Sequence, residues 1–175
     1  MIPLRATALA PAPAFNEQAR LEELADYRIL GTWPETQFDE VTQLISTMFR
    51  TSMAIVSIVG RDKQWLKSSL GLQTREMARD TSFCTHTIMS DEVMVVPDAR
   101  QDLRFKDNPL VTRSPHIRFY AGAPLLTKNG FRIGALCALD TKPRASFESR
   151  EEALLKNFAG LVMTQLELRR DRLPG

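Results

Sequence analysis

The spacing of apolar residues changes along the chain, and these changes predict the order of its helices and strands. In three segments the apolar positions recur every three or four residues, as on one face of a helix. Elsewhere, short runs rich in β-branched residues are nearly continuous, which is typical of strands inside a sheet. The pattern predicts helices over 21–30, 35–50 and 149–172, a short helix over 81–89, and strands over 53–59, 64–69, 93–96, 118–126 and 132–139.

The segment from Ile117 to Asp140 is the most informative, because Asn129 and Gly130 separate two apolar runs. Asn-Gly is a strong β-hairpin signal, since a two-residue type I′ turn needs a positive φ at both positions. Such a turn fixes the register of the two strands. It places on one face Tyr120, Gly122, Pro124, Ile133, Ala135, Cys137 and Leu139. Both faces are apolar or small, so we expect helices to cover one face and loop-built lids the other.

A long polar segment, residues 98–115, precedes this hairpin. Loops of this length inside a compact domain are usually functional or disordered, and Phe105 would anchor this one. The small residues Gly122 and Gly134 leave room above the hairpin. We therefore expect a cavity between the sheet, the 98–115 segment and the 81–89 segment.

The last predicted helix, residues 149–172, has a wider apolar stripe than one sheet face needs. We expect a homodimer in which this helix and the 21–30 helix meet their symmetry mates, with Leu161 and Leu168 at the interface. The helix ends in a charged run, which suggests a connection to a C-terminal output domain.

Composition places the chain among ordinary globular domains. It has 175 residues, and its net charge of +2 gives no argument for nucleic acid or an anionic membrane as a partner. No apolar run reaches the roughly 20 residues of a membrane span. The two cysteines do not make a disulfide framework, so we expect a cytoplasmic, reducing location. Residues 1–19 predict a disordered arm rich in Ala and Pro, followed by a single domain over 20–172.

Five stretches resemble a known family: ILGTWPETQFDEVTQLI, the strand with Trp65, SFCTHTI, VVPDARQDLRFKDNPLV and FYAGAPLLTKNGFRIGALCALD. Together they resemble a GAF domain, the small-molecule sensor module of bacterial signalling proteins, over about residues 20–170. They are most similar to the branch found at the front of histidine kinases and diguanylate cyclases. The resemblance implies an α+β fold, with the terminal helices on one face of an antiparallel sheet and a ligand pocket between the other face and the lids.

The chain departs from three specialised branches of this family. Relatives that attach a bilin use a cysteine in a Ser-Pro-Cys-His-like segment, but this chain reads Arg-Ser-Pro-His from position 113, so a covalent bilin is not expected. The Asn-Lys-x-x-x-Phe-x-x-x-Asp-Glu signature of the cyclic-nucleotide branch is absent. The branch that reduces free methionine sulfoxide uses cysteines around its pocket, and Cys84 and Cys137 lack that branch's surrounding sequence.

Candidate ligand contacts lie in the lids and on the strand that follows them. They are Phe83, His86, Asp102, Phe105, His116, Arg118 and Tyr120. Arg118 could meet an anionic group or pair with Asp102 or Asp107. His116 could reach the ligand or stay exposed. The alternating charges of the 98–104 segment are more simply a staple of the loop.

The sequence holds no nucleophile elbow, P-loop, Rossmann glycine pattern or paired-carboxylate motif. Cys84 and His86 could form a thiolate pair or a metal site. No second ligand pair with zinc spacing occurs, however. We therefore expect Cys84 and Cys137 to be free, buried packing residues without metal. We therefore expect a non-enzymatic sensor that binds an unidentified small molecule or transmits a signal through a helical dimer. The alternatives are a redox enzyme of the free methionine sulfoxide reductase type and a ligand-free dimerisation module.

Overall fold

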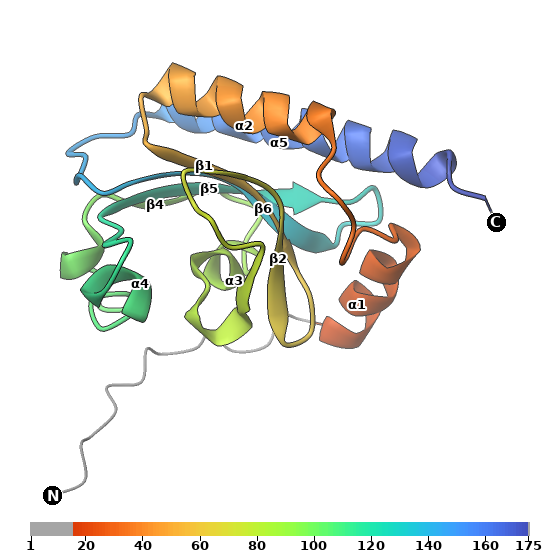
Figure 1. Ribbon diagram of the computed structural model, residues 1–175, viewed down its shortest axis with the longest axis horizontal. Helices are drawn as coiled ribbons and strands as arrows, with labels where there is room; N and C mark the ends of the chain where they lie inside the picture. Colours follow the sequence, from red (N-terminus) through yellow and green to blue (C-terminus); the bar gives the residue numbers. More distant parts are fainter. Residues whose placement is uncertain (1–15, 175) are drawn as a thin grey trace, which may run out of the picture.

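The computed structural model describes residues 16–174, and a six-stranded sheet forms its centre (Figure 1). The strands are β1 (Met53–Val59), β2 (Lys63–Leu70), β3 (Glu76–Ala78), β4 (Met94–Val96), β5 (Phe119–Leu126) and β6 (Arg132–Asp140). They lie in the order β3-β2-β1-β6-β5-β4, and every neighbouring pair is antiparallel. The predicted α+β fold with an antiparallel sheet is confirmed.

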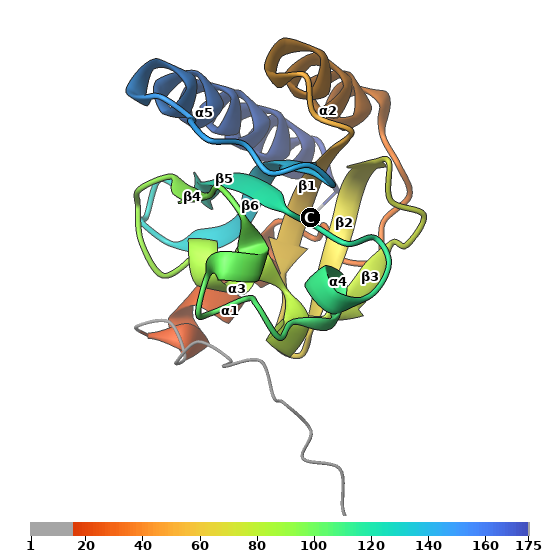
Figure 2. The same cartoon turned by 90° about the vertical axis from the view of Figure 1, so that its left-hand side faces the viewer.

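Helices lie on both faces of this sheet. They are α1 (Glu17–Asp26), α2 (Thr36–Phe49), α3 (Phe83–Thr87), α4 (Pro109–Thr112) and α5 (Ser149–Asp171), with short 3₁₀ turns η1 (Arg79–Thr81) and η2 (Ala99–Gln101). Figure 2 shows α2 and α5 side by side on one face, the helix side, and α3 and α4 on the other, the lid side. We call residues 79–90 and 97–118 the lid segments.

The sheet separates two apolar cores, because successive strand residues point to opposite faces. On the helix side, Phe38, Leu136 and Val162 belong to the core that joins the sheet to α2 and α5. On the lid side, Ile55 and Phe105 belong to the core that joins the sheet to the lid segments. Strand β6 contributes to both cores, so a change on either side acts on a strand that the other side also contacts.

The register predicted for the β5–β6 hairpin is confirmed over most of its length. Tyr120 pairs with Leu139, and Gly122 pairs with Cys137. These residues therefore share one face of the sheet, as the alternation of the two strands predicted. This pairing brings Cys137 under the lid, next to the phenol of Tyr120.

The turn of the hairpin differs from the prediction. Thr127 and Phe131 close a longer turn, in which the Thr127 carbonyl accepts a hydrogen bond from the Gly130 amide at 2.9 Å. Gly130 has a φ of 85°, whereas Asn129 is not among the described residues with positive φ, so the turn is not type I′. The pairing is irregular beside the turn, and Ile133 consequently packs in the helix-side core rather than on the lid side.

Helix α1 begins earlier than expected and lies apart from α2 and α5. The predicted arm covers residues 1–19, of which 1–15 lie outside the described residues. Residues 17–19 are helical, and the side chain of Asn16 caps the helix. The helix stands at the end of the sheet where the β5–β6 hairpin turns (Figure 1). There the buried guanidinium of Arg20 donates to the carbonyl oxygen of Val59 at 2.8 Å.

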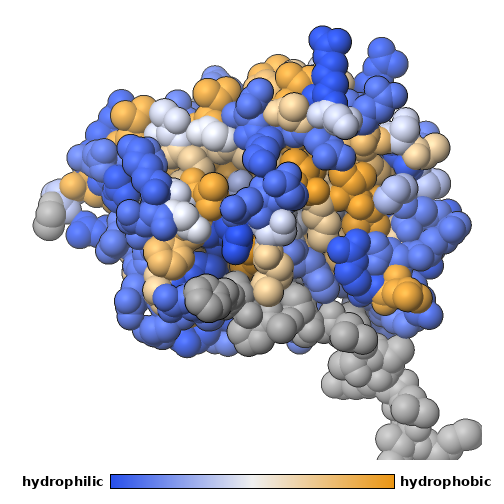
Figure 3. All heavy atoms as spheres, turned by 180° about the vertical axis from the view of Figure 1, so that it is seen from behind, coloured by the Kyte–Doolittle hydropathy of each residue, from blue (hydrophilic) through white to orange (hydrophobic). Residues whose placement is uncertain are grey.

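Helix α5 carries apolar side chains on two sides. Leu155, Val162 and Leu166 are buried, whereas Leu161 is 56% exposed and Leu168 44% exposed. Neighbouring α2 also has exposed apolar residues, Leu44 and Met48. Figure 3 shows hydrophobic residues between hydrophilic ones along this helical layer. Within the described part of the chain, no helix is both long and apolar enough to cross a membrane.

Candidate functional site

Two thiols and two hydroxyls meet under the lid. The Sγ atoms of Cys84, on α3, and Cys137, on β6, lie 3.4 Å apart. The Tyr120 hydroxyl lies 3.2 Å from the Cys137 sulfur and 3.5 Å from the Cys84 sulfur. It also shares a 2.7 Å hydrogen bond with the hydroxyl of Thr87. All four side chains are buried, and we call them the thiol–tyrosine cluster.

The space beside Gly122 and Gly134, which was expected to leave room for a ligand, is occupied by other atoms of the protein. A Cβ added at Gly122 would lie 2.2 Å from the Tyr120 hydroxyl oxygen, so the phenol occupies the space that this glycine leaves. A Cβ at Gly134 would lie 1.9 Å from the carbonyl oxygen of Ser57. Gly134 therefore permits close strand packing, and Gly122 permits the position of Tyr120 in the cluster.

Aromatic rings connect the cluster to the lid. The ring of Phe83 stacks on that of Phe105, with centroids 4.0 Å apart and planes at 10°. Phe83 also contacts Tyr120, at 5.2 Å between centroids, and His86 meets Phe105 edge-on at 4.8 Å. Because Phe83 precedes Cys84 on the same short helix, a shift of α3 would move both the stack and the thiol.

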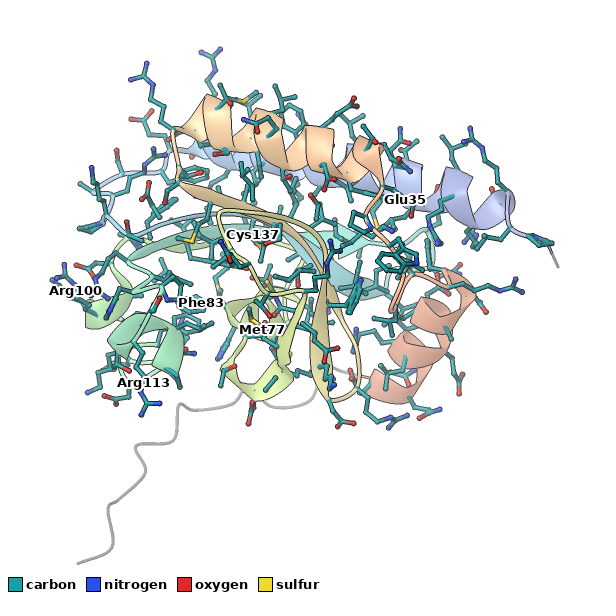
Figure 4. The ribbon with its side chains drawn as sticks, viewed as in Figure 1. Glu35, Met77, Phe83, Arg100, Arg113 and Cys137 are labelled. Carbon is teal, nitrogen blue, oxygen red and sulfur yellow. The ribbon has the colours of Figure 1, made fainter. Side chains whose placement is uncertain are left out.

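A small cavity lies beside the cluster, with a volume of about 20 Å³. Its lining is almost entirely apolar and consists of Ile55, Gln64, Leu72, Met77, Phe83, Cys84, Leu110, Ile117, Tyr120 and Leu139. Figure 4 places Met77 and Phe83 on the lid side of the strand that carries Cys137. A space of this size holds about one water molecule, so any larger ligand requires the lid segments to move.

The two thiols differ in their electrostatic surroundings. Burial alone would raise the pKa of the Cys84 thiol, but hydrogen bonds, first from Cys137 and also from Tyr120, outweigh burial and lower it. Burial and the neighbouring Cys84 raise the pKa of Cys137 well above its usual range. Burial likewise raises the pKa of Tyr120. Hydrogen bonds thus favour a thiolate at Cys84 against the effect of burial, and Tyr120 stays a hydrogen-bond donor.

The structure brings together only part of the predicted site. Phe83 and Tyr120 line the cavity, and Phe105 and His86 lie behind them in the aromatic stack. Burial, and then the charge of Arg104, lower the pKa of His86.

The other three candidates lie outside the cavity. His116 is exposed, with a left-handed φ of 58°. Arg118 donates to the carbonyl oxygen of Val111 at 2.9 Å, and Asp102 pairs with Arg104 at 2.7 Å. Both charged candidates are thus engaged within their own loop, as staples of the lid.

Sequence reasoning missed the pairing of the cysteines, which it treated as separate packing residues. The register had already placed Cys137 on the face of Tyr120, and this was the available signal. The position of Cys84 depends on how the lid folds back, which no local pattern encodes. Within the described residues, no group of three or more His, Cys, Asp or Glu side chains could hold a metal ion.

Comparisons with known proteins agree with this architecture. The GAF domain family model matches residues 34–166. A cyclic di-GMP phosphodiesterase of Pseudomonas aeruginosa is 38% identical over 161 residues, which is 92% of this chain and 27% of that protein. The chain thus spans about a quarter of the length of this curated relative.

Solved structures show the same fold at low identity. The GAF domain of an Acinetobacter phosphoenolpyruvate-protein phosphotransferase has a TM-score of 0.67 at 12% identity, covering 91% of this chain and 98% of that one. The free methionine-R-sulfoxide reductase of Neisseria meningitidis has a TM-score of 0.64 at 16% identity, covering 95% and 99%.

The comparisons correct one expectation from the sequence, namely that the chain is non-enzymatic. That prediction rested on the absence of catalytic motifs. A relative at 38% identity is named as a phosphodiesterase, and a protein of the same fold is named as a reductase. The absence of a familiar motif was therefore too weak a basis for excluding enzymatic activity.

Proposed function

The chain belongs to the GAF domain family, and we propose that it is the sensor domain of an enzyme that hydrolyses cyclic di-GMP. The observation that carries the proposal is the match to the Pseudomonas phosphodiesterase, which takes in 92% of this chain but only 27% of the relative. Such proportions suit a regulatory module that works together with further parts of a larger protein.

The two-sided architecture supports a sensory role. The lid side holds the cavity and the thiol–tyrosine cluster, and the helix side holds the paired helices α2 and α5. Strand β6 belongs to both, through Cys137 on one face and Leu136 on the other. A ligand that orders or displaces the lid segments would act on the helices through this strand, because packed cores pass on small shifts.

A homodimer completes the proposal. The exposed apolar residues of α5 (Leu161 and Leu168) and α2 (Leu44 and Met48) form a surface that a second copy could cover. The interface proposed from the sequence paired α5 with the 21–30 helix. In the structure Leu24 and Tyr27 are buried, so α2 takes the place of that helix in the proposed interface.

Native mass spectrometry of freshly purified protein tests the sensory role. We expect a dimer that retains a small molecule, released when the protein is denatured. The lid variant Phe105→Ala should lose this molecule, because Phe105 holds the stack over the cavity, whereas Leu103→Ala, an exposed neighbour, should keep it. Retention of the molecule by Phe105→Ala would contradict the location of the site.

A second candidate function is the reduction of a small sulfoxide, which the 3.4 Å approach of two thiols favours. The apolar cavity of about 20 Å³ is too small for a free amino acid unless the lid segments open. Incubation of the protein with methionine-R-sulfoxide and a dithiol, followed by measurement of methionine, decides this point. Release of methionine that depends on Cys84 would favour this candidate over the sensor.

A further inference from the structure

We propose that Cys84 and Cys137 are a redox-active pair, in which a small hydroperoxide oxidises Cys84 and Cys137 then closes a reversible disulfide between α3 and β6. The inference goes beyond the proposed function, because it concerns a covalent modification of the lid-side core. It rests on the geometry of the thiol–tyrosine cluster.

The two sulfur atoms are close enough for a disulfide after a small movement. They lie 3.4 Å apart, and a disulfide bond is about 2.05 Å long, so they must approach by about 1.4 Å. Cys137 lies within β6, between β1 and β5. Cys84 lies on α3, a helix of five residues that belongs to the lid segments. The movement therefore falls on α3 rather than on the sheet.

The two thiols differ in their position relative to the cavity, and this difference gives them different roles. Cys84 lines the cavity, and Cys137 does not. An oxidant that enters the cavity thus meets Cys84 first, and hydrogen bonds to the Cys84 sulfur lower the pKa of its thiol and favour the reactive thiolate. The Tyr120 hydroxyl, 3.5 Å from the Cys84 sulfur, can donate a hydrogen bond to this thiolate. Cys84 is the attacking thiol, and Cys137 is the resolving thiol.

The chemistry balances with a hydroperoxide as the oxidant. The Cys84 thiol releases its proton, its sulfur attacks the outer oxygen, an S–O bond forms and the O–O bond breaks. The leaving oxygen takes that proton and departs as water or an alcohol, which leaves a sulfenic acid on Cys84. The sulfur of Cys137 then displaces the hydroxyl group, which leaves as water with the Cys137 proton. In total, the two thiols lose two electrons and two protons, and the hydroperoxide is reduced.

Formation of the disulfide would also move the aromatic stack. Phe83 precedes Cys84 on α3, and its ring lies 4.0 Å from that of Phe105. Drawing α3 toward β6 would displace this stack, and with it the lid segments that close the cavity. The oxidised and reduced proteins would therefore present different lid surfaces.

Peptide mapping of the wild-type protein tests the proposal. The native protein is treated with hydrogen peroxide, blocked with N-ethylmaleimide in denaturant, and digested with trypsin. Cleavage after Arg79 and Arg100 gives the peptide 80–100 with Cys84, and cleavage after Arg132 and Arg144 gives the peptide 133–144 with Cys137. We expect these two peptides to be linked to each other, with the loss of two free thiols per chain, and we expect dithiothreitol to separate them.

Three controls make the outcome decisive. In Cys137→Ser, dimedone should label Cys84 as the trapped sulfenic acid. In Cys84→Ser, Cys137 should remain a free thiol after the same peroxide treatment. The wild-type linkage should not depend on protein concentration, because it forms within one chain. Recovery of both wild-type peptides fully blocked by N-ethylmaleimide would overturn the proposal, and so would a linkage that forms only between chains or only after unfolding.

Discussion

The buried ammonium group of Lys67 donates a hydrogen bond to the carboxylate of Glu35 on the helix side of the sheet. The same carboxylate accepts a 2.8 Å hydrogen bond from Arg169, near the end of α5. Lys67 belongs to β2, and Glu35 is the residue before α2 (Figure 4 labels Glu35). Three elements are thus joined by one ionic network, and the network fixes where α5 ends relative to the sheet.

Replacement of Lys67 by methionine should lower the free energy of unfolding by about 1–3 kcal/mol. The change removes a fully buried charge, and it leaves the Thr32 hydroxyl and the Trp33 carbonyl without their donor. Urea unfolding measures the effect. The matched control is Lys63→Met on the same strand, where the ion pair with Glu76 is exposed and the loss should be much smaller than for Lys67→Met. Equal losses in both variants would show that the buried network contributes no more to stability than the exposed ion pair.

The stability of the protein should fall in acid through Glu17. Burial by itself would raise the pKa of Glu17, but hydrogen bonds from Arg20 and Arg79 outweigh it and lower the pKa from its ordinary value of 4.5 to about 2. Because the folded-state pKa is depressed, this contribution is present above about pH 4.5 and is lost as the pH falls towards 2. Because solvent screens this partly exposed carboxylate, the full shift is not realised, and Glu17→Gln should be only about 1–2 kcal/mol less stable at pH 7.

Urea unfolding of wild type and Glu17→Gln at several pH values between 7 and 2.5 checks this assignment. The difference in unfolding free energy should stay constant down to about pH 5 and should then narrow. A difference that stays the same at every pH would mean that Glu17 contributes by packing and not by its charge.

The close packing of the Tyr120 phenol against Gly122 gives a third prediction. Gly122→Ala should lower the free energy of unfolding by about 1–3 kcal/mol, because its Cβ would lie 2.2 Å from the Tyr120 hydroxyl oxygen. The matched control is Gly160→Ala in α5, where a Cβ meets nothing within 4 Å and should be neutral or stabilise the helix by up to about 1 kcal/mol. Denaturant unfolding measures both changes. A neutral Gly122→Ala would show that the phenol moves aside freely.

The dimer proposed for the helix side can be tested at Leu161, which is 56% exposed. Leu161→Glu should shift the protein from dimer to monomer, since losing an apolar residue from the centre of an interface typically costs about 1 kcal/mol or more. Sedimentation velocity over a range of concentrations measures the shift. The control is Leu103→Glu, an exposed leucine on the lid side that should leave the dimer unchanged. A wild type that is monomeric at the highest concentration would contradict the proposal.

Local sequence patterns predicted the fold, because strand alternation and helical spacing are set by residues that are close together in the sequence. The alternation in β5 and β6 fixed the register that pairs Gly122 with Cys137, and the apolar spacing of α2 and α5 gave the two helices. The start of α1 was missed because Asn16 caps a helix whose first residues lie in the segment read as an Ala/Pro-rich arm. The turn type was missed because Asn-Gly also fits a longer turn in which only Gly130 has positive φ.

The candidate site was harder to predict, because it depends on contacts between distant segments. Arg118 and Asp102 were named for their charge, yet each has a partner close by in the lid. His116 was named for its place before a strand, but its backbone turns the side chain out to solvent. Conversely, the approach of Cys84 to Cys137 spans 53 residues along the chain. Only the folded lid brings these thiols together.

The central claim, that this domain senses on its lid side and regulates an enzyme acting on cyclic di-GMP, is tested most directly by one assay. The assay measures the rate of cyclic di-GMP hydrolysis by the larger protein that we propose contains this chain, as wild type and with Tyr120→Phe or Leu103→Ala. Tyr120→Phe removes the hydroxyl at the centre of the thiol–tyrosine cluster, whereas Leu103 is exposed. We predict that the wild type hydrolyses cyclic di-GMP, that Tyr120→Phe changes the rate several-fold, and that Leu103→Ala leaves it unchanged. A wild type without this activity, or a rate that is the same in all three proteins, would contradict the claim.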